Sequence, residues 1–134
     1  MAKIAAIEGI GDVTAEKFAL VGITTTEALL DACATAAGRK ELAAKTGLDA
    51  SQLLGWANRA DLFRIKGIGT QYSDLLEASG VDTVPELAQR NAENLHAKMT
   101  EVNAAKKLVR QLPTLRLVQG WVAQAKELPR MIGY

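Results

Sequence analysis

Two short glycine motifs are the residues of this sequence best suited to bind a ligand. Residues 7–11 read Ile-Glu-Gly-Ile-Gly, and residues 65–69 read Ile-Lys-Gly-Ile-Gly. Glycine lets the backbone turn tightly, and the first amides of a following helix lack intrahelical partners. Such amides, at the positive end of the helix dipole, form an anion site that suits phosphate. We name residues 7–11 hairpin 1 and residues 65–69 hairpin 2.

The two hairpins differ in charge. Hairpin 1 has Glu8 where hairpin 2 has Lys66, and Asp12 and Glu16 follow it. These carboxylates would repel a phosphate, so Gly9 and Gly11 are expected to form a weaker or purely structural hairpin. Hairpin 2 combines cations with neutral donors in the next helical turn. Its predicted phosphate-binding residues are Gly67, Gly69, Lys66, Arg64, Thr70, Gln71 and Ser73.

A second group of cations could extend this surface. Apolar residues at helical spacing predict a buried stripe consisting of Ala104, Ala105, Leu108, Val109 and Leu112. Lys106, Lys107 and Arg110 would then point outward as a candidate basic face. Such a triplet is more often an ordinary solvated surface, and a Gly-Ile-Gly turn can serve close helix packing alone. Trp56 and Trp121 are interpreted as core anchors.

The elements that position these motifs are predicted to be helices. The repeat continues beyond the glycines, with Phe18 matching Leu76 and Gly22 matching Gly80. Asp12 and Thr70 are predicted caps of the helices after the hairpins, and the two later glycines would end those helices. Further helix starts are predicted at the Thr24–Glu27 and Thr83–Glu86 capping boxes, Asp49 and Asn91.

Composition supports an all-α fold. Alanine and leucine favour helix, and aromatic residues make up only 4% of the chain. We expect about nine or ten short helices in one compact domain of two tandem repeats, residues 1–62 and 63–134. The second repeat would include a carboxyl-terminal closing helix containing Trp121 and Leu128. Because hairpin 1 has almost no chain before it, we expect that helix to pack against Ile7, Ile10 and Phe18.

Charge and reactive residues restrict the possible functions. The formal net charge is +1, with six Lys/Arg against eight Asp/Glu in residues 1–62 and ten against seven in residues 63–134. A broad basic surface is therefore excluded, although a local one is not. Cys33 and His96 are each the single residue of their type. A Cys33–His96 dyad remains open, but no paired carboxylates or metal-ligand pattern stand out, so we predict no enzyme activity, metal or cofactor.

The amino terminus lacks the apolar stretch of a signal peptide. No apolar run approaches the roughly 18 residues that cross a bilayer. We expect a cytoplasmic protein that does not enter membranes and that is a monomer or a dimer.

The glycine motifs and capped helices resemble helix-hairpin-helix proteins. Over nearly the whole chain, the sequence is similar to the bacterial domain-of-unknown-function family 4332. It shares that family's elements GIG, GIT(T)T, WANRADL-RIKGIG and W-(x)3-AKEL. Helix-hairpin-helix resemblance implies sequence-independent binding of duplex DNA or other nucleic acid, through backbone phosphates near the hairpin glycines. The alternative is a protein-interaction or scaffold module that keeps the fold without binding DNA.

Overall fold

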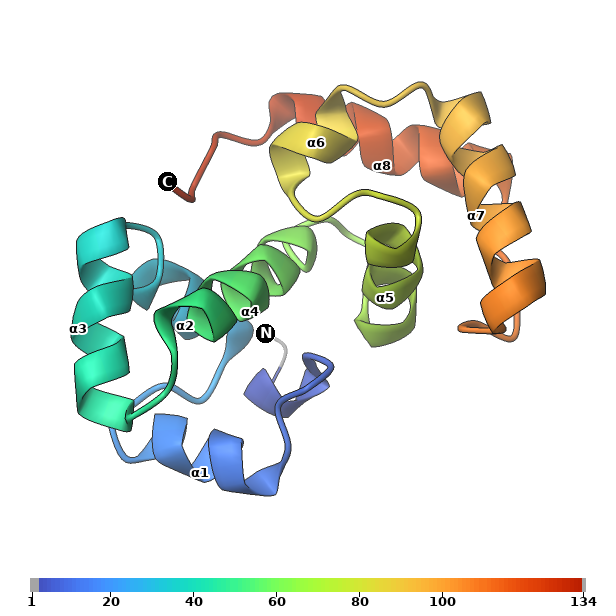
Figure 1. Cartoon of the computed structure of the whole chain (residues 1–134). Coiled ribbons are helices and arrows are strands. Elements are labelled where there is room, and N and C mark those ends of the chain that lie inside the picture. The colour runs from blue at the N-terminus through green and yellow to red at the C-terminus, as the bar shows by residue number, and fades with distance from the viewer. Residues whose placement is uncertain (1–2, 134) are drawn as a thin grey trace. The chain divides into compact units, whose positions relative to one another are not determined.

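Helices account for almost all regular structure in this chain. The computed structural model describes residues 3–133, which contain eight α-helices and one 3-10 helix (Figure 1). Over this range the only strand-like pairing is an isolated antiparallel bridge between Lys3 and Thr25. The predicted all-α class is confirmed. No helix in the described range is long and apolar enough to cross a membrane.

The chain divides into two units, Met1–Phe63 with Arg130–Tyr134, and Arg64–Pro129. The elements of the first unit are η1 (Ile4–Ala6), α1 (Asp12–Ala19), α2 (Thr26–Ala32), α3 (Ala36–Thr46) and α4 (Ala50–Leu62). Helix α4 packs against both α2 and α3, and η1 packs against α1. Aliphatic residues dominate the resulting core, with Phe18 as its one fully buried aromatic side chain in the described part of this unit.

The second unit consists of α5 (Thr70–Ala78), α6 (Val84–Ala88), α7 (Ala92–Lys106) and α8 (Leu115–Glu127). Helix α8 packs against α6 and α7, and α5 packs against α7. Apolar residues of α8 recur at helical spacing and are buried, namely Val118, Trp121, Val122 and Ala125. Helix α8 is therefore part of the core of the second unit.

The packing predicted for the carboxyl-terminal helix is wrong. The apolar face of α8 is covered within the second unit, and the tryptophan beside hairpin 1 belongs to α4. After α8 the chain contributes only a short extended segment to the first unit. There Ile132 is buried in the core, and the amide of Gly133 donates to the carbonyl of Ala34 at 2.7 Å.

Six of the eight α-helices begin after a residue whose side chain accepts a hydrogen bond from the first helical turn. These residues are Thr25, Thr35, Asp49, Thr83, Asn91 and Thr114. The Thr24–Glu27 capping box is shifted by one residue, because Thr25 accepts from the amide of Ala28.

The remaining α-helices, α1 and α5, are capped differently from the prediction. Their N-caps are Gly11 and Gly69, with no side-chain hydrogen bond, and Asp12 and Thr70 are already the first helical residues. The predicted caps are wrong because the extended backbone that precedes each helix is supplied by glycine, one position earlier. The first-turn amides of α1 and α5 thus face no capping side chain.

Both helices end as expected. Gly22 and Gly80 adopt positive φ angles of 81° and 94°. The next residue donates back to the fifth residue before it, Ile23 to Phe18 and Val81 to Leu76, each at 2.9 Å. This hydrogen bond closes the helix end in a Schellman arrangement.

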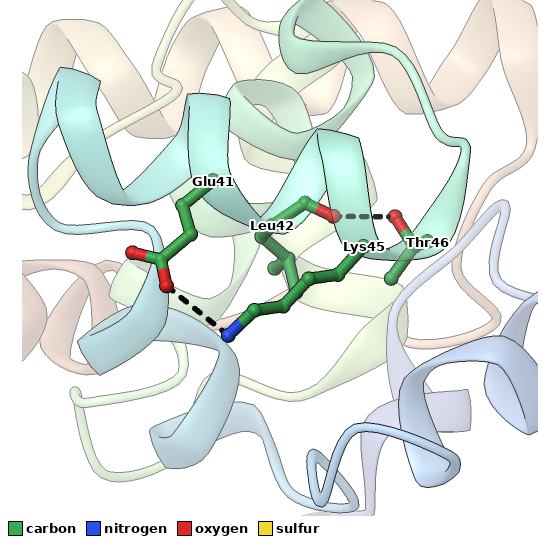
Figure 2. Close-up of polar contacts among 4 residues, drawn as sticks. All are labelled: Glu41, Leu42, Lys45 and Thr46. Carbon is green, nitrogen blue, oxygen red and sulfur yellow. Dashed lines mark hydrogen bonds and ion pairs between the residues drawn. The ribbon is translucent and has the colours of Figure 1, made fainter.

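Helix α3 illustrates the modest role of surface charge in the first unit. Lys45 Nζ lies 3.1 Å from Glu41 Oε1, and the Thr46 hydroxyl donates to the carbonyl of Leu42 at 2.8 Å (Figure 2). Both charged side chains are more than half exposed, so the pair contributes only about 0.3–0.5 kcal/mol. The buried Leu42 between them is the residue that ties α3 to the core.

The predicted stripe after Ala104 is also wrong. Helix α7 ends at Lys106, and Lys107 adopts a left-handed conformation with φ of 52°. Ala104 and Ala105 are exposed. The side-chain amide of Asn103 binds both backbone groups of Val109, and these bonds replace the helical ones that the stripe would need.

Candidate functional site

The two hairpins adopt the same backbone conformation. Gly9 and Gly67 have φ angles of 93° and 95°. In each turn the second isoleucine donates to the carbonyl of the first at 3.2 Å, Ile10 to Ile7 and Ile68 to Ile65. The flanking isoleucines are buried, so each turn is fixed to the core of its own unit.

A tryptophan covers the first glycine of each hairpin. A Cβ atom on Gly9 would lie 3.2 Å from Trp56 Nε1, and one on Gly67 would lie 3.1 Å from Trp121 Nε1. Trp121 is 1% exposed, and its indole nitrogen has no hydrogen-bond partner within the described structure. Both tryptophans therefore act as core anchors that need glycine beneath them.

An aromatic residue after each hairpin packs against the corresponding tryptophan. The rings of Phe18 and Trp56 lie 5.9 Å apart, edge to face, and those of Tyr72 and Trp121 lie 5.2 Å apart, tilted. Such pairs add about 0.5–1.5 kcal/mol beyond their burial. The helix after each hairpin is thereby joined to the tryptophan helix of the same unit.

Helix α8 also fixes hairpin 2 through polar contacts. The amide of Lys66 donates to Gln124 Oε1 at 3.1 Å, and Gln124 Nε2 donates to the carbonyl of Lys66 at 3.5 Å. The guanidinium of Arg64 donates to the carbonyl of Pro129 at 2.9 Å. The side chain of Lys66 is exposed.

A surface pocket of about 480 Å³ opens where hairpin 2 meets the loop between α7 and α8. It is lined by Gly67, Gly69, Thr70, Gln71, Tyr72, Arg110 and Gln111. The Tyr72 hydroxyl donates to the carbonyl of Gln111 at 3.2 Å and so ties the two walls together. The pocket thus combines the amino-terminal end of α5 with one guanidinium, both of which attract anions.

The structure brings part of the predicted set together. Gly67, Gly69, Thr70 and Gln71 line the pocket, and Arg110 joins them from the candidate basic face. The other predicted residues lie outside this lining. Lys66 belongs to hairpin 2 and Arg64 directly precedes it, Lys106 and Lys107 are exposed at the end of α7, and Ser73 is buried.

Ser73 offers no donor to a ligand, since its hydroxyl donates to the carbonyl of Thr70 at 2.9 Å and the residue is 1% exposed. Sequence reasoning missed Tyr72 and Gln111. Tyr72 occupies the first turn of α5 and could have been found from that position. Nothing in the sequence around Gln111 indicates that its loop meets hairpin 2.

Hairpin 1 presents a different surface. Glu8 and Asp12 are exposed where hairpin 2 has Lys66 and Thr70. Val13, at the position of Gln71, is 70% exposed, and Leu20 at the end of α1 is 81% exposed. This face is acidic near the turn, and along the helix the exposed Glu16 and Lys17 lie between the two apolar side chains.

Two hollows lie in the described part of the first unit. One of about 250 Å³ is lined mainly by aliphatic residues together with the Glu41–Lys45 pair (Figure 2). Another of about 450 Å³ lies between η1, α1 and the segment before α2. Neither is lined by Cys33, and residues 3–133 contain no group of three or more side chains able to hold a metal ion.

Cys33 is fully buried in the core of the first unit. Arg39, itself 7% exposed, donates to the carbonyl of Cys33 at 2.9 Å. Burial raises the pKa of Cys33 to about 11, although the nearby Arg39 charge lowers it slightly. His96 lies in the second unit, with Nε2 3.0 Å from the carbonyl of Pro113.

This environment predicts an unreactive thiol. At pH 8 only about one Cys33 thiol in a thousand would be ionised, and the thiolate is the nucleophile. Alkylation by iodoacetamide should be much slower in the folded protein than in urea, and should accelerate as the pH rises toward 11. Equal rates in both states would contradict a buried, protonated thiol.

The comparisons with known proteins identify a family. The model of the family described as "Domain of unknown function (DUF4332)" matches residues 8–128. No curated protein and no solved structure matches the chain. The family match covers residues 8–11 of hairpin 1, all of hairpin 2 and the pocket beside hairpin 2.

Proposed function

This chain belongs to the DUF4332 family, and we propose that it is a non-catalytic module of two helix-hairpin-helix repeats that binds nucleic acid through backbone phosphate. The observation that carries the proposal is the pocket beside hairpin 2. There Gly69 and Thr70 begin a helix without a capping side chain, and Arg110 lines the same pocket.

The chemistry of this pocket favours a phosphate over other ligands. Amides at a helix start suit oxygen anions, and a guanidinium can donate two parallel hydrogen bonds to one phosphate. Lys66 is exposed beside the pocket and adds positive charge. These groups would contact the backbone and read no base, so binding would be independent of sequence.

The charge distribution predicts weak and salt-sensitive binding. The formal net charge of the chain is only +1, and hairpin 1 carries carboxylates in place of the cations. One hairpin would therefore neutralise few phosphates. Each phosphate contact contributes about 0.9 to the slope of log K against log salt, so a shallow slope is expected.

Titration of a labelled duplex of random sequence at two salt concentrations tests the proposal. Arg110→Ala should weaken binding of all sequences and reduce the salt slope by about 1, because one cation leaves the phosphate site. Lys66→Glu should weaken binding further, since it adds repulsion to the lost charge.

Two charge changes outside the pocket serve as controls. Lys98→Glu makes the same change as Lys66→Glu at an exposed position of α7 that does not line the pocket, and should cost much less affinity. Glu8→Lys should leave binding unchanged or raise it. Absence of duplex binding at low salt, or equal losses in Lys98→Glu and Lys66→Glu, would overturn the proposal.

The surface of α1 favours a second candidate, a protein-interaction or scaffold role. Val13 in its first turn and Leu20 directly after its last residue are both largely exposed. The two side chains lie about two turns apart on one side of α1, with the exposed Glu16 and Lys17 between them, and together would form a contact surface of mixed apolar and charged character. If this role is correct, Val13→Ser with Leu20→Ser should abolish partner binding and leave both helical content and duplex binding unchanged.

A further inference from the structure

Two side-chain amides hold the walls of the pocket in the same way. Gln124 of α8 binds the amide and the carbonyl of Lys66, at 3.1 and 3.5 Å. Asn103 of α7 binds the amide and the carbonyl of Val109, at 3.0 and 3.1 Å. In each case one amide side chain satisfies both backbone groups of a single loop residue.

Lys66 and Val109, the two loop residues held in this way, each directly precede a residue that lines the pocket. Lys66 precedes Gly67, and Val109 precedes Arg110. The carbonyl of one residue and the amide of the next belong to one planar trans peptide, in which C=O and N–H point in opposite directions. By binding the carbonyls of Lys66 and Val109, the two side chains therefore also fix the directions of the amides of Gly67 and Arg110.

Lys66 and Val109 both lie outside the helices. Gly67 adopts a positive φ of 95°, a region that glycine samples freely. Lys107, two positions before Val109, adopts a left-handed conformation that costs residues with a side chain roughly 1–2 kcal/mol. Without the Gln124 and Asn103 side chains, each segment would lose two of the hydrogen bonds that hold it in place.

We propose that Gln124 and Asn103 are positioning residues, which preorganise the pocket for phosphate without contacting it. The inference rests on the proposed phosphate-binding function of the pocket. It assigns a role in nucleic-acid binding to two neutral side chains that line no part of the site.

The test compares Gln124→Ala and Asn103→Ala with matched controls on the same helices. Gln119→Ala removes an exposed glutamine side chain of α8, and Asn94→Ala removes an exposed asparagine side chain of α7. For all four full-length variants, the duplex titration is combined with the melting temperature and amide hydrogen exchange at Lys66 and Val109.

Each positioning variant should bind duplex DNA roughly three- to ten-fold more weakly, the effect of losing one or two net hydrogen bonds. The salt slope should remain that of the wild type, because no cation is removed. The amide of Lys66 in Gln124→Ala, and that of Val109 in Asn103→Ala, should exchange about ten-fold faster. The controls should change neither quantity.

The possible failures are distinguishable. Wild-type protein that binds no duplex at low salt overturns the proposed function, and with it a role for these residues in binding. Unchanged exchange at Lys66 and Val109 overturns the positioning role even if DNA is bound. Faster exchange in a positioning variant that keeps wild-type affinity also overturns it. So does a loss of affinity and of melting temperature that is equally large in the control variants.

Discussion

Replacing Trp121 with alanine is expected to lower the free energy of unfolding by about 3–5 kcal/mol, the usual range for removing a large buried aromatic side chain. Trp121 is 1% exposed and joins three parts of the second unit: hairpin 2 through Gly67, α5 through Tyr72, and its own helix α8. Urea denaturation followed by circular dichroism measures the loss. Hydrogen exchange should show weakened protection at Ile68 and Leu76.

Trp121→Phe separates the stability gained from packing of the ring from the cost of burying the indole N–H. The indole nitrogen is buried without a partner in the described structure, and an unpaired buried donor costs about 1–3 kcal/mol. Phenylalanine removes this cost but leaves a smaller ring, so it should destabilise by less than half as much as alanine. A loss below about 1 kcal/mol for Trp121→Ala would contradict its role as an anchor.

The sequence was sufficient to predict those features that depend on local rules. The all-α class follows from the helix-forming composition and is confirmed. The glycine repeat predicted two equivalent turns, and Gly9 and Gly67 indeed have φ angles of 93° and 95°. Gly22 and Gly80 end their helices as expected, because this conformation is costly for a residue with a side chain.

The errors arose at helix ends, where one hydrogen bond or the backbone conformation of one residue decides the boundary. The stripe from Ala104 to Leu112 has helical periodicity, yet Asn103 captures Val109 and the helix ends at Lys106. Asp12 and Thr70 have the right chemistry for caps, but the glycine before each supplies the extended backbone. Periodicity and composition do not show that α7 ends at Lys106, or that glycine supplies the N-caps of α1 and α5.

The misplaced carboxyl-terminal helix has a specific cause. The register that aligns Gly9 with Gly67 aligns Trp56 with Thr114, and not with Trp121. The two tryptophans nevertheless occupy the same place, over Gly9 and Gly67. The prediction treated the Trp121 helix as one that should lead into a hairpin and so assigned it to hairpin 1, whereas each tryptophan follows in sequence the hairpin that it covers.

The candidate site was predicted only in part. The glycines and first-turn residues of hairpin 2 could be found, because they are contiguous in sequence. The rest of the site comes from much later in the chain. The loop between α7 and α8 supplies Arg110 and Gln111, and the two helices supply the side-chain amides of Asn103 and Gln124. Their placement beside hairpin 2 depends on how α7 and α8 pack, which local sequence does not determine.

The two glycines of hairpin 2 should respond very differently to the same substitution. Gly67→Ala is expected to lower the free energy of unfolding by about 2–5 kcal/mol. A left-handed backbone costs alanine roughly 1–2 kcal/mol, and forcing an extra atom into a packed site typically adds about 1–3 kcal/mol. Gly69→Ala should cost only about 0.5–1 kcal/mol, which is the preference of an N-cap for glycine over alanine.

The contrast follows from two independent features of the same turn. A Cβ on Gly67 would lie 3.1 Å from Trp121 Nε1, and Tyr72 packs against that indole, so the ring cannot easily move away. Gly69 has an ordinary φ of −116°, and a Cβ there would meet no atom within 4 Å. Urea denaturation of both variants tests the difference. Equal losses would mean that the indole does not hold the turn, and that another contact requires the first glycine.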